Sequence, residues 1–417
     1  MLLVLIVLIF LFLIIVTDNM IEKSILYPPF IFNSIWFLVI FIYFLYKIFD
    51  PDEMDTLHSN TLIFIVLSNL FFFLGGLFVI TNSKKKPKEI LFRPSKIPEI
   101  LDDIILVVTV LALILLYYKA VDLASRIEAK NFLMALRYQL TNVRLNYGIL
   151  EYFLSFGLFA SLYRLYTFDK FSDLNKKKKV KTVLAVLISF GFLVLSTGRT
   201  YFFFYFIVVI LSIYLKSKIK RKYFWGTFLA ALAVFILVGV VLNKGGNLEY
   251  SLAKNISSSM DHILAYFEGP LLAFDRFLNS EFDHTYGENT FRFFIALLYE
   301  LKIIDKPPLD IVNEWILVPY PTNVFTVFYE YVMDFGRIGC LIIIFLFGLL
   351  HTWMFYRSKT AGNHFKMITA YSYYPLLMVF FQDQYVSLLS FWIQLWFYSF
   401  LILYILDIRR SGKKLFA

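Results

Sequence analysis

The sequence has little of what a water-soluble protein contains. Only 17% of its 417 residues are charged, 60% are hydrophobic and the mean hydropathy is +0.72. A soluble domain is about half apolar and about a quarter charged, so this class is excluded. The single cysteine, Cys340, excludes a disulfide framework and any metal site made of several thiolates. A glycine-rich phosphate loop is also missing, which argues against an ATP-driven machine.

The apolar residues, with 49 Phe and 28 Tyr among them, fall in blocks rather than in strand or coiled-coil periods. A bilayer core of about 30 Å is crossed by roughly 20 apolar residues in a helix. The sequence therefore predicts an all-α, polytopic integral membrane protein with about 11 (10–12) transmembrane helices. The expected spans are 1–16, 30–49, 61–80, 102–120, 149–168, 181–198, 200–216, 223–242, 323–353, 367–386 and 388–407.

The basic residues predict the orientation of these spans. Of 40 Lys and Arg, 24 lie in five short segments, and each neighbouring pair of segments is separated by two spans. Positive residues mark cytoplasmic loops, so all five segments and the C-terminus are expected inside. The net charge of +10 is then explained without a nucleic-acid partner. Residues 1–16 have no basic flank or small-residue cleavage site, which favours a retained helix over a signal peptide.

This orientation places the longest connections outside the cell. The predicted divisions are residues 1–242, with helices one to eight and an outer loop at 121–148; 243–322, a large extracytoplasmic loop bearing short helices; and 323–417, with the last three helices. Within the smaller loop, residues 127–147 have the apolar spacing of an amphipathic surface helix. The stretch 323–353 is too long for one span, so we expect a short external helix ending near Gly336 and a span from about Ile338.

The two sides differ in their cations. Lys outnumbers Arg 19 to 5 in the cytoplasmic clusters, whereas the two outer loops carry five arginines. The guanidinium group matches phosphate oxygens in a bidentate fashion. The outer arginines therefore favour a phosphorylated substrate at the outer leaflet, although pairing with nearby carboxylates or lipid headgroups would also account for them.

Three elements together resemble a known family. They are the tight turn Ser196-Thr197-Gly198-Arg199-Thr200, the large outer loop, and the stretch from Pro321-Thr322-Asn323 to Asp334-Phe335-Gly336-Arg337. An arginine followed by ten residues and a glycine occurs in both outer loops, as Arg137 with Gly148 and Arg276 with Gly287. In these features the chain resembles the Wzy-type oligosaccharide repeat-unit polymerases (O-antigen and capsular polysaccharide polymerases). A His-plus-Gly variant of the second motif is absent.

The resemblance implies a GT-C-like glycosyltransferase of the bacterial cytoplasmic (inner) membrane. Such an enzyme moves a growing glycan from undecaprenyl diphosphate to the non-reducing end of a new lipid-linked unit on the outer face. The implied partners are the lipid-linked oligosaccharide, membrane lipids and a chain-length regulator protein. No cofactor is implied, and no metal is expected, because HExxH is absent and arginine alone can neutralise a lipid diphosphate.

That reaction needs fixed cations for the diphosphate and a base for the acceptor hydroxyl. The candidates for diphosphate binding are Arg137, Arg144, Arg199, Arg276, Arg292 and Arg337. The candidates for acid–base work are Asp283, His284, Glu288 and Asp334, with Asp261–His262 as a second possibility. The motif glycines are Gly148, Gly198, Gly287 and Gly336.

Simpler interpretations remain open for several of these residues. The segment EFDHTYGEN is also typical of a polar turn with Gly287 as its hinge, and Arg199 could reach lipid headgroups. Asp334 could orient Arg337 or Arg199, or form an i,i+3 pair with Arg337.

Two other functions compete with the polymerase. A lipid-linked glycan ligase would share the helices, the outer loop and the arginines. A flippase or secondary transporter is disfavoured because no inverted repeat is visible and charge within the spans is sparse, with Arg164 and Asp383 as the notable cases.

Overall fold

The computed structural model describes residues 1–49, 55–82, 92–128, 131–217, 226, 267–310 and 312–405. These residues are mostly helical and include two short strands. They fall into two compact units, one drawn from residues 1–88, 260–357 and 372–390, the other from 89–259, 358–371 and 391–417. The all-α prediction is confirmed.

In the described part of the chain, seven helices are long and apolar enough to cross a membrane. They are α1 (Leu2–Ile21), α2 (Pro28–Phe49), α3 (Ser59–Asn82), α4 (Glu99–Ala124), α7 (Lys176–Ser196), α8 (Arg199–Ser217) and α12 (Phe328–Ser358). Each matches an expected span, and the protein is a polytopic membrane protein. The expected span at 223–242 lies outside the described residues except for Gly226.

Three expected spans have different limits in the structure. At 149–168 the chain forms a 3-10 turn (Gly148–Glu151), helix α6 (Tyr152–Leu162) and a second 3-10 turn (Tyr163–Tyr166). At 367–386 helix α13 runs from Asn363 to Leu377 and ends two residues after Pro375, whose ring and missing N–H disfavour a continuing helix. The last expected span is α14 (Leu389–Ser399), continued as a π-helix over Phe400–Ile405.

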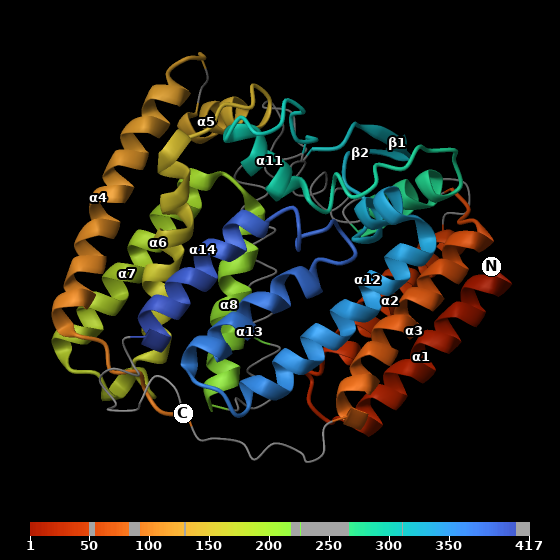
Figure 1. Ribbon diagram of the computed structural model, residues 1–417, viewed down its shortest axis with the longest axis horizontal. Coiled ribbons are helices and arrows are strands. Elements are labelled where there is room, and N and C mark those ends of the chain that lie inside the picture. Colours follow the sequence, from red (N-terminus) through yellow and green to blue (C-terminus); the bar gives the residue numbers. More distant parts are fainter. Residues whose placement is uncertain are drawn as a thin grey trace. The chain divides into compact units, whose positions relative to one another are not determined.

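In the first unit, α1, α2 and α3 contact one another and lie side by side (Figure 1). Helices α3 and α12 approach backbone to backbone, because a Cβ built on Gly75 would lie 2.1 Å from the Phe345 carbonyl oxygen. Gly348 meets the Phe72 carbonyl in the same way. Small residues allow such close approach between membrane helices. A buried hydrogen bond of 2.7 Å from Asn33 to Asp18 also joins α2 to α1.

Short elements precede α12 in this unit. Residues 267–278 form a helix, α11 spans Arg292–Glu300, and β1 (Ile316–Val318) pairs antiparallel with β2 (Tyr320–Thr322). Helix α12 is interrupted at Gly336, where φ is 69° and ψ is −178°. The predicted break near Gly336 is therefore confirmed, and it separates a short first segment from the long apolar one.

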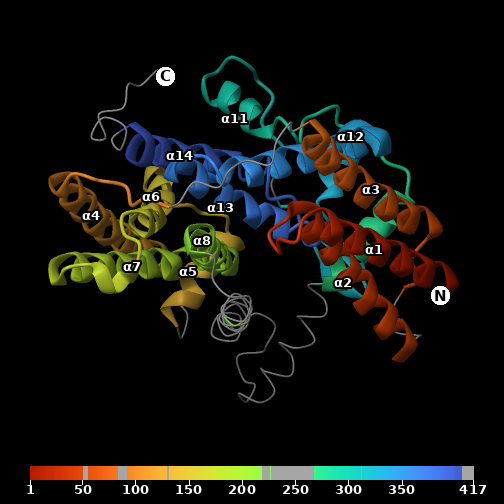
Figure 2. The same ribbon diagram turned by 90° about the horizontal axis from the view of Figure 1, so that it is seen from below.

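In the second unit, α4, α6 and α7 contact one another, and Figure 2 shows them grouped together. Gly157 of α6 faces the ring of Phe192 of α7, where an added Cβ would lie 2.3 Å away. The buried Arg164 forms an ion pair of 2.9 Å with Asp102 of α4. This pair accounts for one of the two charges noted within the expected spans.

The amphipathic helix predicted at 127–147 is shorter in the structure. Helix α5 spans Phe132–Thr141, and the Asn131 side chain caps its start by accepting a 2.9 Å hydrogen bond from the Leu133 amide. Leu136 on its apolar face is fully buried in a cluster with residues of α4 and α7. The helix ends before Arg144, whose φ of 61° lies in the left-handed region.

Candidate functional site

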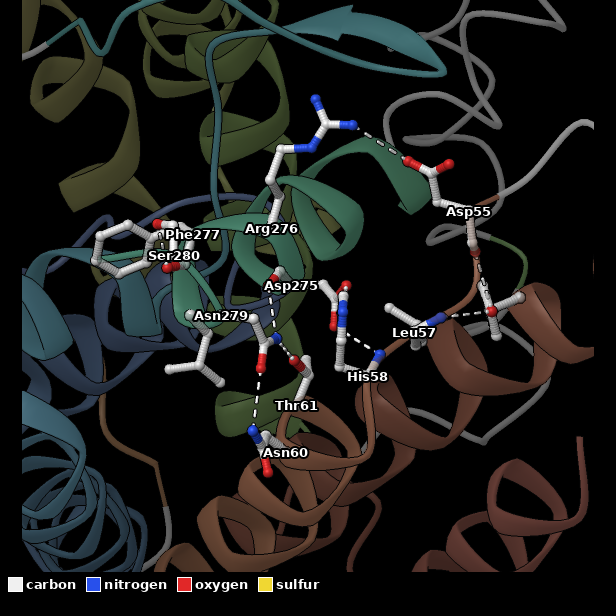
Figure 3. A network of polar contacts seen from close by, with 12 residues as sticks. Asp55, Leu57, His58, Asn60, Thr61, Asp275, Arg276, Phe277, Asn279 and Ser280 are labelled. Atoms are coloured by element: carbon white, nitrogen blue, oxygen red, sulfur yellow. Dashed lines mark hydrogen bonds and ion pairs between the residues drawn. The ribbon is translucent and has the colours of Figure 1, made fainter. Parts of the chain in front are cut away.

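The helix over residues 267–278 places several polar side chains against the start of α3. Figure 3 shows this network: Asp275, Arg276 and Asn279 face residues 55–61, the described part of the connection between α2 and α3 and the first turn of α3. All of these residues belong to the first unit. The two segments are more than two hundred residues apart in the sequence and meet only in the folded chain.

Of the contacts between these two segments, the shortest joins His58 to Asp275. The His58 imidazole Nδ1 lies 2.9 Å from one carboxylate oxygen of Asp275, and the His58 backbone N–H donates to the other oxygen at 3.0 Å. The Asp275 side chain is only 6% exposed, whereas that of His58 is 60% exposed. The carboxylate is thus fixed on the inner side of the imidazole, and the rest of the ring remains accessible.

Neighbouring residues hold this arrangement in place. The Asn279 side chain donates to Thr61 Oγ1 at 3.1 Å and accepts from Asn60 at 3.1 Å (Figure 3). The Tyr43 hydroxyl of α2 donates to the Asp55 carbonyl and accepts from the Leu57 amide. The connection that carries His58 is therefore bound on two sides, by α2 and by the helix 267–278.

Arg276, one of the predicted diphosphate ligands, lies beside this pair. Its guanidinium donates to the Leu317 carbonyl of β1 at 2.8 Å and lies 3.5 Å from a carboxylate oxygen of Asp55. Its side chain is 56% exposed. An exposed guanidinium with one carbonyl and one long ion-pair contact retains N–H groups that can reach an anion.

The segment containing the predicted acid–base residues is bound to α12 through Asp334. The Asp334 carboxylate accepts five hydrogen bonds: from the Thr285 hydroxyl, the Asn289 backbone and side-chain N–H groups, and the Thr290 backbone N–H and hydroxyl. Asp334 is only 2% exposed. Both of its oxygens are therefore occupied, and it pairs with neither Arg337 nor another cation among the described ion pairs.

The other predicted acid–base residues in this segment have different surroundings. His284 is exposed; its Nδ1 lies 3.1 Å from the Met333 carbonyl oxygen, and its ring lies next to Gly336. Asp283 is exposed. Glu288 forms an ion pair of 2.5 Å with Lys306. Gly287 has a φ of 96°, which is consistent with the predicted turn. Asp261 and His262 lie outside the described residues.

Two more predicted arginines belong to the first unit. Arg337 donates at 2.8 Å to the carbonyl of Leu278, at the end of the helix 267–278, where carbonyl groups lack a partner within the helix. Arg292 at the start of α11 is half-buried and donates to the Leu309 carbonyl. Burial lowers the pKa of Arg292, and the nearby Asp310 opposes this effect.

The remaining arginines, Arg137, Arg144 and Arg199, belong to the second unit. Arg137 lies on α5, Arg144 is exposed just beyond it, and Arg199 begins α8 with only 7% of its surface exposed. The connection between α7 and α8 has only two residues, Thr197 with φ 50° and Gly198, so the predicted tight turn is present. Gly148 has a φ of 61°.

A buried carboxylate, Glu268, lies on the helix 267–278 two turns before Asp275. Its side chain is fully buried, and neither carboxyl oxygen has a hydrogen-bond partner among the described residues. Burial therefore raises the pKa of Glu268 well above its usual range. Within the described residues, no three His, Cys, Asp or Glu side chains come close enough together to hold a metal ion.

Sequence reasoning missed His58, Asp275 and Glu268. His58 lies between two predicted spans, and Asp275 follows an apolar run directly before Arg276, so neither forms part of a local motif. One signal was available: Asp275 and Asn279 are four residues apart and therefore lie on one face of a helix. Their partner could not be identified from that spacing.

No protein-family model matches the sequence, and no solved structure matches it. Two curated proteins are similar to it. An O-antigen polymerase of Shigella dysenteriae is 28% identical over 220 residues, which are 51% of this chain and 53% of that protein. A putative O-antigen polymerase of Escherichia coli K12 is 23% identical over 388 residues, which are 90% of this chain and 91% of that protein. The chain thus matches about half of the first protein and nearly all of the second. These likenesses confirm the resemblance found in the sequence: the chain is similar to proteins named O-antigen polymerase.

Proposed function

We propose that this protein polymerises lipid-linked oligosaccharide repeat units in the bacterial cytoplasmic membrane. The observation that carries this proposal is the likeness to a putative O-antigen polymerase over 90% of the chain, together with the seven helices suited to cross a membrane in its described part. In the proposed reaction the growing glycan leaves undecaprenyl diphosphate on the outer face and joins the non-reducing end of a new unit. A chain-length regulator would be a partner, and the C-terminus would be cytoplasmic.

Arg276 is the best supported diphosphate ligand in the first unit. The leaving diphosphate gains negative charge as the glycosidic bond breaks, and fixed cations at that place lower the barrier. Arg276 is exposed and makes a long contact with Asp55, which a phosphate oxygen can replace. Guanidinium groups neutralise the leaving group in this scheme, so the reaction needs no metal.

Asp334 has a structural part in this proposal. Its carboxylate accepts five hydrogen bonds from residues 285–290 and has no free oxygen for a proton from the acceptor. We assign it the task of fixing the segment 281–290 on α12. Asp283 and His284 then lie on the exposed side of that segment, where they can contact the glycan.

The proposal is tested with surface polysaccharide from a strain that lacks this gene. A polymerase predicts that the strain has a single capped repeat unit and no ladder on a gel, and that the wild-type gene restores the ladder. Arg276→Ala, expressed at the same level, should fail to restore it. Arg126→Ala is the matched control, because Arg126 is also exposed and paired with a carboxylate, Asp122.

Other outcomes would assign another function. If long chains persist in the deletion strain but stay on the carrier lipid, the protein is a glycan ligase. If no repeat unit reaches the outer leaflet, the protein is a transporter, and the argument from the arginines is wrong.

A further inference from the structure

We infer that His58 is the general base of glycosyl transfer and that Asp275 is the positioning residue that orients it. The inference rests on the proposed function and identifies which group accepts the proton of the acceptor hydroxyl. It comes from one juxtaposition: an exposed imidazole held by a buried carboxylate, beside an exposed guanidinium that can bind a phosphate (Figure 3).

The hydrogen bonds fix the tautomer of His58. An ionised carboxylate can only accept hydrogen bonds, so the His58 Nδ1 that lies 2.9 Å from Asp275 must carry the proton. The lone pair is then on Nε2, on the far side of the ring from the carboxylate. A second bond, from the His58 backbone N–H to the same carboxylate, limits rotation of the residue.

A carboxylate partner also suits the charge that the reaction creates. When Nε2 takes a proton, the ring becomes an imidazolium, and a negative group at Nδ1 stabilises it. Of the histidines that the structure describes, His58 is the one bonded to a carboxylate. His284 is also exposed, but its Nδ1 faces the neutral Met333 carbonyl, which stabilises an imidazolium less. Among the described residues, Asp55 and Arg276 form an ion pair of 3.5 Å in the same network (Figure 3).

The proposed step is a displacement at the anomeric carbon of the donor glycan. The oxygen of the acceptor hydroxyl forms a bond to the anomeric carbon of the donor glycan. The bond between that carbon and the diphosphate oxygen breaks, and its electron pair leaves with the lipid diphosphate. The hydroxyl proton moves to Nε2 of His58. Arg276, the residue that follows Asp275 in the sequence, neutralises the leaving group. The imidazolium then releases the proton to solvent.

The test uses the full-length protein in membrane vesicles from the deletion strain, which contain the accumulated lipid-linked units. The measured quantity is the initial rate of ladder growth. His58→Asn is the key variant, because the Asn amide N–H can replace Nδ1–H toward Asp275 but supplies no base. We expect it to reach the membrane at the wild-type level, to unfold at the wild-type temperature, and to lose about 10²- to 10⁴-fold in rate.

Two further variants separate a base from a structural residue. His58→Ala should lose as much rate as His58→Asn and recover part of it when imidazole is added, whereas the wild-type rate should not change. Asp275→Asn should lower the maximal rate while the unit concentration needed for half of that rate stays the same. A merely structural contact predicts no rescue by imidazole.

The inference is overturned if His58→Asn retains the wild-type rate, or if His284→Asn loses activity while His58→Asn does not. If wild-type vesicles make no polymer from the accumulated units, the proposed function fails, and the inference fails with it. Polymer made by the wild type but not by His58→Asn, with imidazole rescue of His58→Ala, supports both.

Discussion

Replacing Asp334 by Ala should release the segment 285–290 from α12. The carboxylate accepts hydrogen bonds from two backbone amides, Asn289 at 3.2 Å and Thr290 at 2.7 Å, and from three side-chain groups. A buried donor left without a partner costs about 1–3 kcal/mol, so the two amides alone give about 2–6 kcal/mol. Because every 1.4 kcal/mol changes an equilibrium constant tenfold, the population of molecules with this segment opened should rise at least about 30-fold.

Hydrogen exchange measured by mass spectrometry on the purified protein tests this estimate. The amides of Asn289 and Thr290 should exchange at least about 30-fold faster in Asp334→Ala, while amides in α3 should not change. Asp334→Asn should give little recovery, because whichever oxygen becomes an NH₂ group would face a donor. Asp283→Ala is the control, since Asp283 is exposed and makes no hydrogen bond among the described residues. Equal exchange in Asp334→Ala and Asp283→Ala would refute the reasoning.

Three further changes have predictable effects on stability. The pKa of the buried Glu268 is raised, so the folded state keeps a proton that the unfolded state loses above about pH 4.3, and stability falls as pH rises toward the folded pKa. In a series of thermal-unfolding measurements across pH, Glu268→Gln should make this fall less steep. The same pH dependence in the wild type and in Glu268→Gln would contradict this prediction. Arg164→Ala leaves Asp102 without its buried partner and should cost about 3–5 kcal/mol, part of which Asp102→Asn should restore in thermal unfolding. Gly336→Ala forces a side chain into a left-handed backbone and should cost about 1–3 kcal/mol in the same assay, whereas Gly362→Ala, with no atom nearer than 3.8 Å, should cost less than half of that.

The sequence determined the membrane-spanning helices well where apolar runs are long and uninterrupted. The runs in α1 and α3 give helices that cover nearly all of their expected spans, because a segment in lipid must satisfy its backbone hydrogen bonds within itself. The break in α12 could also be predicted, since Gly336 lies between a segment with charged residues and an uninterrupted apolar run. Prediction was poorer for the limits of two other helices. Pro375 shortened α13, and α5 ended before Arg144 although the apolar spacing continues.

In the candidate site, too, some features could be predicted from the sequence and others could not. The arginines, the length of the predicted outer loop and the motif glycines are properties of the sequence, and they indicated a resemblance to the glycan polymerases. The hydrogen bonds of Asp334 could not be predicted, because their five donor groups, on Thr285, Asn289 and Thr290, lie more than forty residues away in the sequence. The pairing of His58 with Asp275 spans 217 residues. Local patterns specify which residues can form helices and which can carry charge. Only packing decides which side chains meet, because hydrogen bonds and ion pairs act over a few ångströms of space whatever their separation along the chain.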